Sequence, residues 1–271
     1  MTAPRLILTD LDGTLVRSDK SLSDAVVAAA KRLEAAGVPL SLISARPPSG
    51  MLWIAERLGL SHPMGAFNGG TIVAADGTIL SAARLDPDVA RRAVALIDRP
   101  EVHMWLFSEG RWHVARPGST HDDSERTTTC QEPVVTPEVT PLLATIDKIV
   151  AVSDDHAMLA DLEGSVAGAL GADATVARSQ PYYLDITAPA ANKGDGVAAL
   201  AEAIGVPLGE VVVIGDQRND LAMFARAGMS IAMGQGPDEV RAAATRVTAS
   251  NDEDGVAQAI DAIILPMVAG R

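Results

Sequence analysis

Short runs of apolar residues recur along the chain, and several of them end directly in polar residues. Residues 6–8, 38–43 and 211–214 have the near-continuous apolar character of strands that are covered on both faces of a parallel sheet. Between such runs, apolar residues follow helical spacing, as in 24–36, where Gly37 ends the pattern. The alternation of strands and helices predicts an α/β fold with a Rossmann-like, doubly wound parallel sheet.

The pattern changes in the middle of the chain, where alternating apolar and polar positions replace continuous apolar runs. Two alternating runs around a short glycine turn are typical of an antiparallel hairpin. The segments predicted here are a helix over 87–97, a hairpin of 102–107 with 111–114, an acidic, threonine-rich loop over 121–129, a strand over 146–152, a helix over 156–170 and further strands at 175–177 and 182–186.

This change of pattern predicts two domains. After residue 186 the chain returns to alternating helices and buried strands, and a final helix is expected to end near Ile264. We therefore expect a discontinuous core domain at 1–84 and 187–271, interrupted by an inserted α+β domain at 85–186. An insertion of about 100 residues has an ordinary domain size.

Composition excludes several classes of protein. The chain has 22 basic and 35 acidic residues and a net charge of −13, which is the wrong sign for binding a nucleic-acid backbone. Cys130 is the only cysteine, so an internal disulfide is impossible, as expected for a reducing compartment. No signal core precedes Asp10, and no run approaches the roughly 18 apolar residues of a membrane span. We expect a soluble, cytoplasmic monomer or homodimer that binds neither nucleic acid nor membrane.

Two aspartates follow the first buried run and are separated by one residue. Alternate residues of an extended segment face the same way, so Asp10 and Asp12 share a face. Ligands of parallel α/β sheets bind just beyond the carboxyl ends of the strands. A calcium loop does not fit, because Leu15 stands where that loop needs glycine and Ser21 where it needs glutamate. Gly13 and Thr14 then provide a tight exit from the strand.

Ser44 follows the second buried run and precedes a predicted helix. Its side chain has two interpretations, a helix cap or a ligand for phosphate, for which the Ser44 hydroxyl and the Ala45 amide would both donate to one oxygen. The Asn68-Gly69 pair likewise has two: a hairpin turn or a substrate contact. These alternatives stay open, as does the role of Arg46.

Asp10-Leu11-Asp12-Gly13-Thr14 after an N-terminal strand resembles the first motif of the haloacid dehalogenase-like (HAD) phosphatases. Ser44, Lys193 and the pair Asp216/Asp220 resemble the later motifs of that superfamily and occur in the same order. With the middle block in the place of a type IIB cap, the chain resembles the Cof-type subgroup of HAD phosphatases. It departs from the common pattern at Ala45, often glycine, and at Gly234-Gln235-Gly236, usually Gly-Asn-Ala.

The resemblance implies roles for these residues. Mg²⁺ would be bound by the carboxylates of Asp10 and Asp216 and by the backbone carbonyl of Asp12, while Asp220 would orient a coordinated water. Asp10 would be the nucleophile and Asp12 the general acid and then base, with Ser44 and Lys193 completing the catalytic set. The residues expected to contact substrate are Leu11, Ser44, Ala45, Lys193 and Asn219.

Charge alone argues for a cation among these groups. A phosphate monoester adds about two negative charges to four aspartates, and two like charges 4 Å apart repel by about 4 kcal/mol even at a surface-like dielectric. Mg²⁺ suits a shell of carboxylate and water oxygens that also accepts a phosphate oxygen. We expect anionic neighbours to raise the pKa of Asp12, while Asp10, on the metal, stays ionised.

The predicted function is a magnesium-dependent phosphatase that hydrolyses small organic phosphate monoesters, sugar phosphates above all, through an aspartyl-phosphate. Its partner would be a small phosphorylated metabolite. Two alternatives are a phosphomutase of similar fold and a non-catalytic phosphate-binding regulatory protein. In the inserted domain, the face formed by His103, Trp105 and Phe107 and the segment after Val176 are candidates for substrate contact or for domain core.

Overall fold

The computed structural model describes residues 3–270, and the chain forms two compact units. We call Met1–Ala45, Met51–Leu80 and Asn192–Arg271 the core unit, and Arg46–Gly50 with Ser81–Ala191 the inserted unit. The sequence placed the limits of the insertion at residues 85 and 186.

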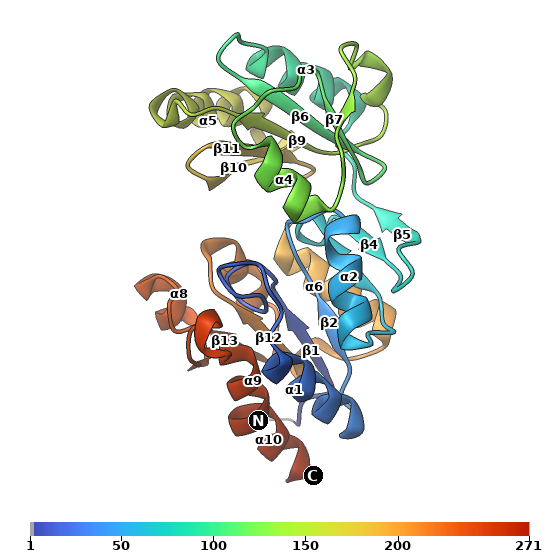
Figure 1. Ribbon diagram of the computed structural model, residues 1–271, viewed down its shortest axis with the longest axis vertical. Helices are drawn as coiled ribbons and strands as arrows, with labels where there is room; N and C mark the ends of the chain where they lie inside the picture. The colour runs from blue at the N-terminus through green and yellow to red at the C-terminus, as the bar shows by residue number, and fades with distance from the viewer. Residues whose placement is uncertain (1–2, 271) are drawn as a thin grey trace. The chain divides into compact units, whose positions relative to one another are not determined.

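The core unit is built on a parallel sheet with the strand order β14-β13-β12-β1-β2 (Figure 1). Its strands are β1 (Leu6–Thr9), β2 (Leu40–Leu42), β12 (Val211–Gly215), β13 (Met229–Ala232) and β14 (Arg246–Val247). β1 and β12 are neighbours at the centre, with Thr9 paired to Ile214 at their carboxyl ends. The predicted α/β class is confirmed, and this register decides which side chains meet beyond the strand ends.

Helices cover both faces of this sheet because strand side chains alternate between the two faces. Leu6 and Leu8 of β1 pack with Val197 and Leu200 of α6 on one face. The helices are α1 (Asp24–Ala35), α2 (Ser49–Leu58), α6 (Lys193–Ile204), α7 (Leu221–Phe224), α8 (Asp238–Ala243), α9 (Gly255–Ala259), a π-helix (Ile260–Ile264) and α10 (Leu265–Ala269).

The core unit also contains a small second sheet and several 3-10 helices. A three-stranded sheet has the order β3-β4-β5 and places the Asn68-Gly69 pair in the turn between antiparallel β3 and β4. Its strands are β3 (Met64–Ala66), β4 (Thr71–Val73) and β5 (Ile79–Ala82), and the 3-10 helices of the unit are Phe67–Gly69, Leu208–Glu210, Arg218–Asp220 and Asn251–Glu253.

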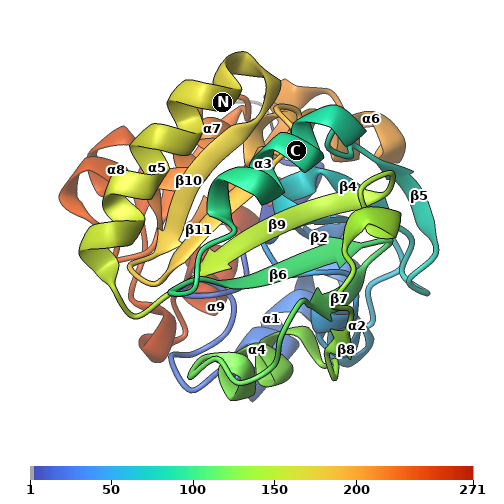
Figure 2. The same ribbon diagram turned by 90° about the horizontal axis from the view of Figure 1, so that it is seen from above.

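The inserted unit is a six-stranded sheet, in the order β10-β11-β9-β6-β7-β8, with two long helices across one face (Figure 2). Its strands are β6 (His103–Ser108), β7 (Arg111–Val114), β8 (Val134–Val135), β9 (Ile146–Val152), β10 (Thr175–Gln180) and β11 (Tyr183–Thr187), and its helices are α3 (Pro87–Ile97), α4 (Asp122–Thr129), α5 (His156–Leu170) and the 3-10 helices Thr140–Leu142 and Gly171–Asp173. Met104, Leu106 and Ile149 belong to the apolar core shared with α3 and α5. Trp105 and Phe107 alternate with them and therefore face the other way.

Two expectations about secondary structure were wrong. Residues 122–129 form helix α4 where the sequence predicted a loop, because Asp122, Asp123 and Glu125 lie in its first turn, where carboxylates stabilise the positive end of the helix dipole. The last helical stretch also runs past Ile264 into α10, since Pro266 stands in the first turn of α10, a position that tolerates a missing N–H.

Among residues 3–270, none of the helices combines the length and apolar character that crossing a membrane requires.

Candidate active site

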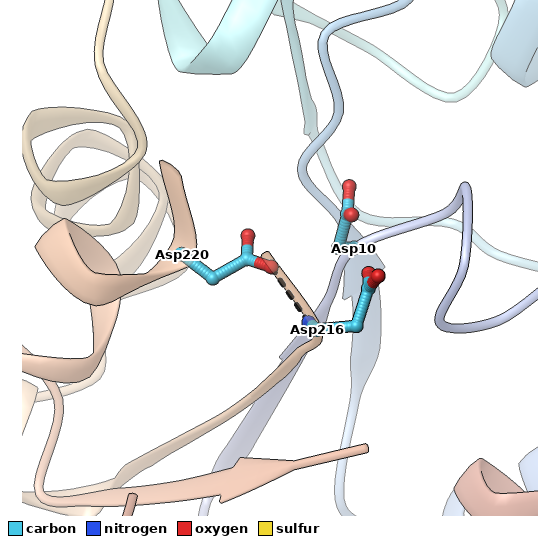
Figure 3. A group of neighbouring side chains, drawn as sticks. All are labelled: Asp10, Asp216 and Asp220. Carbon is cyan, nitrogen blue, oxygen red and sulfur yellow. Dashed lines mark hydrogen bonds between the residues drawn. The ribbon is translucent and has the colours of Figure 1, made fainter. Parts of the chain in front are cut away.

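Asp10 and Asp216 meet because they directly follow two neighbouring parallel strands. Thr9 of β1 pairs with Ile214 of β12, and the Asp10 amide donates to the Ile214 carbonyl at 2.9 Å. The side chains of Asp10 and Asp216 rise from these ends, and Asp220 approaches from the side (Figure 3). One carboxylate oxygen from each of the three residues lies within 4.8 Å of the others, and all three residues are buried. The structure thus brings together three of the predicted carboxylates.

Asp216 is held by the tight turn that follows Asp12. The Thr14 hydroxyl donates to Oδ1 of Asp216 at 2.8 Å. Gly13 has a φ of +78°, and a Cβ at this position would lie 2.5 Å from Oδ2 of Asp216. A larger residue at 13 would therefore both strain the backbone and displace the carboxylate.

Lys193 is the cation of the site. Its Nζ lies 2.7 Å from Oδ1 of Asp10 and 2.6 Å from Oδ1 of Asp220, and its side chain is 1% exposed. It is also the first residue of α6, where the helix dipole disfavours a positive charge. Burial lowers the pKa of Lys193, but the carboxylates of Asp10 and Asp220 outweigh burial and raise the pKa overall. The ammonium charge is thus maintained by the two aspartates and not by its place in the helix.

Asp220 has both carboxylate oxygens occupied by protein donors. Oδ1 contacts Lys193, while Oδ2 accepts from the backbone amides of Asp216 at 2.7 Å and Gln217 at 2.8 Å. Gly215 makes room for it, since a Cβ there would lie 2.5 Å from Cγ of Asp220. Asp220 is therefore placed to position Lys193 and the Asp216 backbone, which leaves Asp10 and Asp216 as the carboxylates best placed for a cation.

Burial makes the negative charges of Asp10 and Asp216 costly. Burial raises the pKa of Asp10 to about 8, with the nearby Asp220 and Asp216 adding to the increase and Lys193 opposing it. Burial also raises the pKa of Asp216 to about 6, against the hydrogen bond from Thr14. A divalent cation between two such carboxylates would restore their ionised forms, and oxygen-only ligands suit a hard cation. The donor set therefore fits a metal ion of the magnesium type.

Asp12 has a different environment from the other aspartates. Its Oδ1 forms an ion pair with Nζ of Lys20 at 2.7 Å, and its side chain is 33% exposed. Lys20 adopts a φ of +68° at the end of a turn in which its amide donates to the Arg17 carbonyl. Asp12 therefore has a cationic neighbour in addition to the anionic neighbours expected from the sequence. The predicted increase in the pKa of Asp12 stays a prediction.

Ser44 and Ala45 follow β2, the strand on the other side of β1. The amide of Ile43 donates to the Thr9 carbonyl at 3.0 Å, which carries the buried Ser44 past the end of the sheet. Ala45 is half-buried. Arg46 is buried and donates to the Gly50 carbonyl at 3.0 Å, in the first turn of α2.

The remaining predicted substrate contacts differ in exposure. Leu11 has a fully buried side chain, and its carbonyl accepts the Val16 amide at 3.0 Å. Asn219 is exposed, and its Nδ2 lies 3.5 Å from Oδ1 of Asn68. Of these two residues, Asn219 alone has a side chain that a ligand could reach from solvent.

Three residues around the site were not predicted. Thr14 and Lys20 both stand close to the aspartate pair in sequence, but neither residue type signals a contact with a particular carboxylate. Gln235 was noted only as a departure from a family pattern; its Nε2 donates to the Gly13 carbonyl at 2.5 Å and its Oε1 accepts the Asn251 amide at 3.2 Å. That departure was the one sequence signal for Gln235, which ties the turn after Asp12 to a distant segment.

Comparison with known proteins identifies the family of this chain. Residues 7–260 match the family model described as haloacid dehalogenase-like hydrolase. The chain is 29% identical over 254 residues to a putative phosphatase of Haemophilus influenzae, covering 93% of this chain and 95% of that protein. A haloacid dehalogenase-like hydrolase of Bacteroides thetaiotaomicron superposes with a TM-score of 0.87 at 29% identity, over 96% and 99% of the two chains.

The fold is also that of the HAD subclass IIB sugar phosphatase BT4131, with a TM-score of 0.81 at 20% identity over 97% of this chain and 99% of that one. The chain belongs to the haloacid dehalogenase-like hydrolase family and is a phosphatase-type hydrolase, so the predicted resemblance to the HAD phosphatases is confirmed.

Proposed function

We propose that this protein is a magnesium-dependent phosphatase that hydrolyses small organic phosphate monoesters, with sugar phosphates as the principal class, through an aspartyl-phosphate. The observation that carries the proposal is the buried cluster of Asp10, Asp216, Asp220 and Lys193 at the ends of β1 and β12. With three carboxylates and one ammonium the cluster is net negative, so it suits an anionic substrate only together with a cation.

Asp10 is assigned the role of nucleophile. In the first step one Asp10 oxygen bonds to phosphorus while the bond from phosphorus to the ester oxygen breaks, which releases the alcohol. Lys193 holds the other end of the same carboxylate and offers its remaining N–H to a phosphoryl oxygen. Mg²⁺ held by Asp10, Asp216 and the Asp12 carbonyl would supply charge neutralisation and a Lewis acid for the phosphoryl oxygens.

Asp12 is assigned the role of general acid and then base. It protonates the leaving alkoxide in the first step. In the second step it takes a proton from water as that water attacks phosphorus, and the bond from phosphorus to the Asp10 oxygen breaks, which releases inorganic phosphate and restores the Asp10 carboxylate. A carboxylate paired with an ammonium holds no proton, so the Asp12–Lys20 pair has to open before the first step. Ser44 with the Ala45 amide and Asn219 are assigned hydrogen bonds to the substrate, and the Leu11 backbone completes that set.

The assignment to sugar phosphates rests on chemistry and on similarity of fold. A solved protein of the same fold is named a sugar phosphatase, and the chain's own cluster makes no demand on the alcohol part of the ester. The inserted unit, proposed as a cap domain over residues 85–186, is where we expect the alcohol to be selected and water to be excluded.

The test is release of inorganic phosphate from a panel of sugar, nucleotide and cofactor phosphates, with Mg²⁺ and with chelator. We expect Mg²⁺-dependent release, fastest with sugar phosphates, and none from Asp10→Asn. A requirement for a bisphosphate activator, with phosphate returned to the substrate, would indicate a phosphomutase instead. No release from any compound by the wild-type protein would overturn the proposal.

A further inference from the structure

The turn between β3 and β4 has an unusual backbone. Phe67, Asn68 and Gly69 follow one another with φ values of +49°, +59° and +86°. Asparagine and glycine adopt this left-handed region readily, but a bulky residue such as Phe67 does so only under constraint. Of the six non-glycine residues with positive φ among residues 3–270, Phe67 and Asn68 are the only adjacent pair. Such strain persists only where the surroundings impose it.

Both elements that impose this conformation belong to the active site. The Asn68 amide donates to the Ser44 carbonyl at 2.7 Å, beyond the end of β2. On the other side, a Cβ on Gly69 would lie 2.4 Å from Cα of Gly196, in the first turn of α6, the helix that begins with Lys193. Phe67 is buried, so the packing of its side chain also holds the turn. The turn is thus clamped between the residues that follow β2 and the start of α6.

A two-residue hairpin turn explains an Asn-Gly pair by itself, because both residues tolerate positive φ. It does not require a third left-handed residue, nor backbone contact with Gly196. These contacts on both sides of the turn fix the position of the Asn68 carboxamide. This carboxamide lies 3.5 Å from Nδ2 of Asn219, the residue before Asp220.

The two carboxamides lie at a more exposed level than the groups assigned to the phosphoryl transfer. Ser44, Lys193 and Asp220 are at most 1% exposed, whereas Asn68 is half-buried and Asn219 is exposed. A separation of 3.5 Å is long for a hydrogen bond, so each amide keeps most of its capacity for a ligand. A carboxamide both donates and accepts, which matches a hydroxyl group rather than an anionic oxygen.

We propose that Asn68 and Asn219 form a carboxamide pair that hydrogen-bonds a hydroxyl group on the alcohol part of the phosphate ester, and that the clamped Phe67–Gly69 turn holds Asn68 in place for this contact. The inference rests on the proposed phosphatase function and extends it, because it makes the pair a selector for hydroxylated substrates. The contact is present before and during phosphoryl transfer, so it lowers KM and leaves kcat unchanged.

The decisive variant is Asn68→Gly. Glycine adopts a φ of +59° without strain, so this change removes the carboxamide while it relaxes the backbone. We expect an unfolding temperature equal to or above that of the wild type. For the sugar phosphate that the wild type hydrolyses fastest, KM should rise about tenfold, as expected for loss of one hydrogen bond, with kcat within about twofold. With p-nitrophenyl phosphate, whose alcohol part has no further hydroxyl, both constants should change less than about twofold.

Cys130→Gly is the matched control. Cys130 lies in the inserted unit, is exposed and has a φ of +54°. The control therefore also places glycine at a residue with left-handed backbone, but away from the proposed contact. We expect no change in KM or kcat with either substrate. Asn219→Ala tests the pair: its effect on KM for the sugar phosphate should be far smaller in the Asn68→Gly background than in the wild type.

Each other outcome overturns the inference in a recognisable way. An unchanged KM for the sugar phosphate in Asn68→Gly removes the contact. An equal loss with both substrates places the contact on the phosphoryl group. A fall in unfolding temperature together with activity makes Asn68 a structural residue of the turn. If the wild type hydrolyses no substrate, the proposed function itself fails and the inference with it.

Discussion

Among residues 3–270, one lysine in each unit contacts aspartate with its side chain largely shielded from solvent, and the two groups differ in how completely their polar atoms are satisfied. In the core unit, Lys193 contacts two carboxylates, and both oxygens of Asp220 have partners. In the inserted unit, Lys148 of β9 contacts Asp185 of β11 at 3.2 Å, with each side chain 11% exposed. Oδ1 of Asp185 is buried with no hydrogen-bond partner among residues 3–270.

The two aspartates differ in whether hydrogen bonds compensate the burial of their charge. Burying an ion pair costs desolvation energy that is recovered only if further hydrogen bonds satisfy the remaining lone pairs. Asp220 meets that condition and fixes Lys193 against Asp10, so the cluster is rigid before a substrate arrives. The pair of Lys148 and Asp185 does not meet that condition, and Nζ of Lys148 lies over the Phe107 ring, 5.8 Å from its centroid. A lysine–aspartate contact alone therefore does not mark a catalytic centre; the proposed centre differs from it by a second carboxylate and by carboxylate oxygens placed for a cation.

The largest effect is expected from Asp10→Asn. This change keeps the shape of the side chain and removes the nucleophile, so phosphate release should fall at least about 10³-fold with every substrate. Since burial raises the pKa of Asp10, a neutral amide is well tolerated there and the unfolding temperature should be retained. Steady-state kinetics and thermal unfolding measure both results. Asp24→Asn, at an exposed carboxylate, is the control, and activity above about a tenth of wild type would contradict the role of Asp10.

Lys193→Met should damage both activity and stability. The variant leaves Asp10 and Asp220 buried without their cation, and breaking a buried pair in this way costs about 3–5 kcal/mol. We expect a loss of that size in the free energy of unfolding, measured by denaturant titration, and at least about a 100-fold loss in kcat/KM. Lys31→Met, on the exposed face of α1, should change neither. A stable, active Lys193→Met protein would remove the core cluster from the mechanism.

The same contrast explains how much the sequence could predict. Asp10, Ser44 and Asp216 were found because each follows a buried apolar run, and parallel strands bring their carboxyl ends to one edge. Contacts made by long side chains left no such periodic signal. The ion pair of Lys20 with Asp12 depends on a single left-handed residue, and the missing partner of Asp185 depends on side-chain packing across three strands.

Secondary structure shows the same limit. Helix α4 contains no apolar residue, so hydrophobic periodicity could not reveal it, although its acidic first turn was visible in the sequence. The strained Phe67–Gly69 turn was also hidden, because Asn-Gly by itself predicts an ordinary hairpin.

Removal of Mg²⁺ should affect the core cluster and not the Lys148–Asp185 pair of the inserted unit. Chelation should abolish phosphate release, and readdition of Mg²⁺ should restore it, because without the cation burial keeps Asp10 protonated and no metal charge neutralises the phosphate dianion. Thermal unfolding should show stabilisation by Mg²⁺ in the wild type and little in Asp216→Asn. The Lys148→Met variant, changed only in the inserted unit, should keep the full Mg²⁺ effect. Undiminished activity in chelator would exclude the proposed metal dependence.

The stabilisation of the folded protein by Mg²⁺ should depend on pH. Burial raises the pKa of Asp216 to about 6 and that of Asp10 to about 8, from 3.8. At pH values between the unperturbed pKa of 3.8 and the raised values, these two carboxyl groups bind more protons in the metal-free folded protein than in the unfolded chain. Their contribution to stability therefore falls as pH rises from about 4 to about 8. Mg²⁺ binds the deprotonated carboxylates, so the gain in unfolding temperature on adding Mg²⁺ should grow from pH 5 to pH 8. Scans with Mg²⁺ and with chelator measure this gain; a gain independent of pH would contradict it.

The smallest effect is expected from replacing the whole pair in the inserted unit. Lys148→Met alone leaves the Asp185 carboxylate buried and unpaired, which should cost about 1–3 kcal/mol of unfolding free energy. Adding Asp185→Leu removes that charge, and because well-packed apolar residues often replace a buried ion pair without loss, the double variant should recover to within about 1 kcal/mol of wild type or exceed it. Denaturant unfolding of the two single variants and the double variant gives the coupling energy directly. Hydrolysis of p-nitrophenyl phosphate by the double variant should stay within about threefold of wild type, whereas a collapse of kcat would show that this pair, like the core cluster, takes part in phosphoryl transfer.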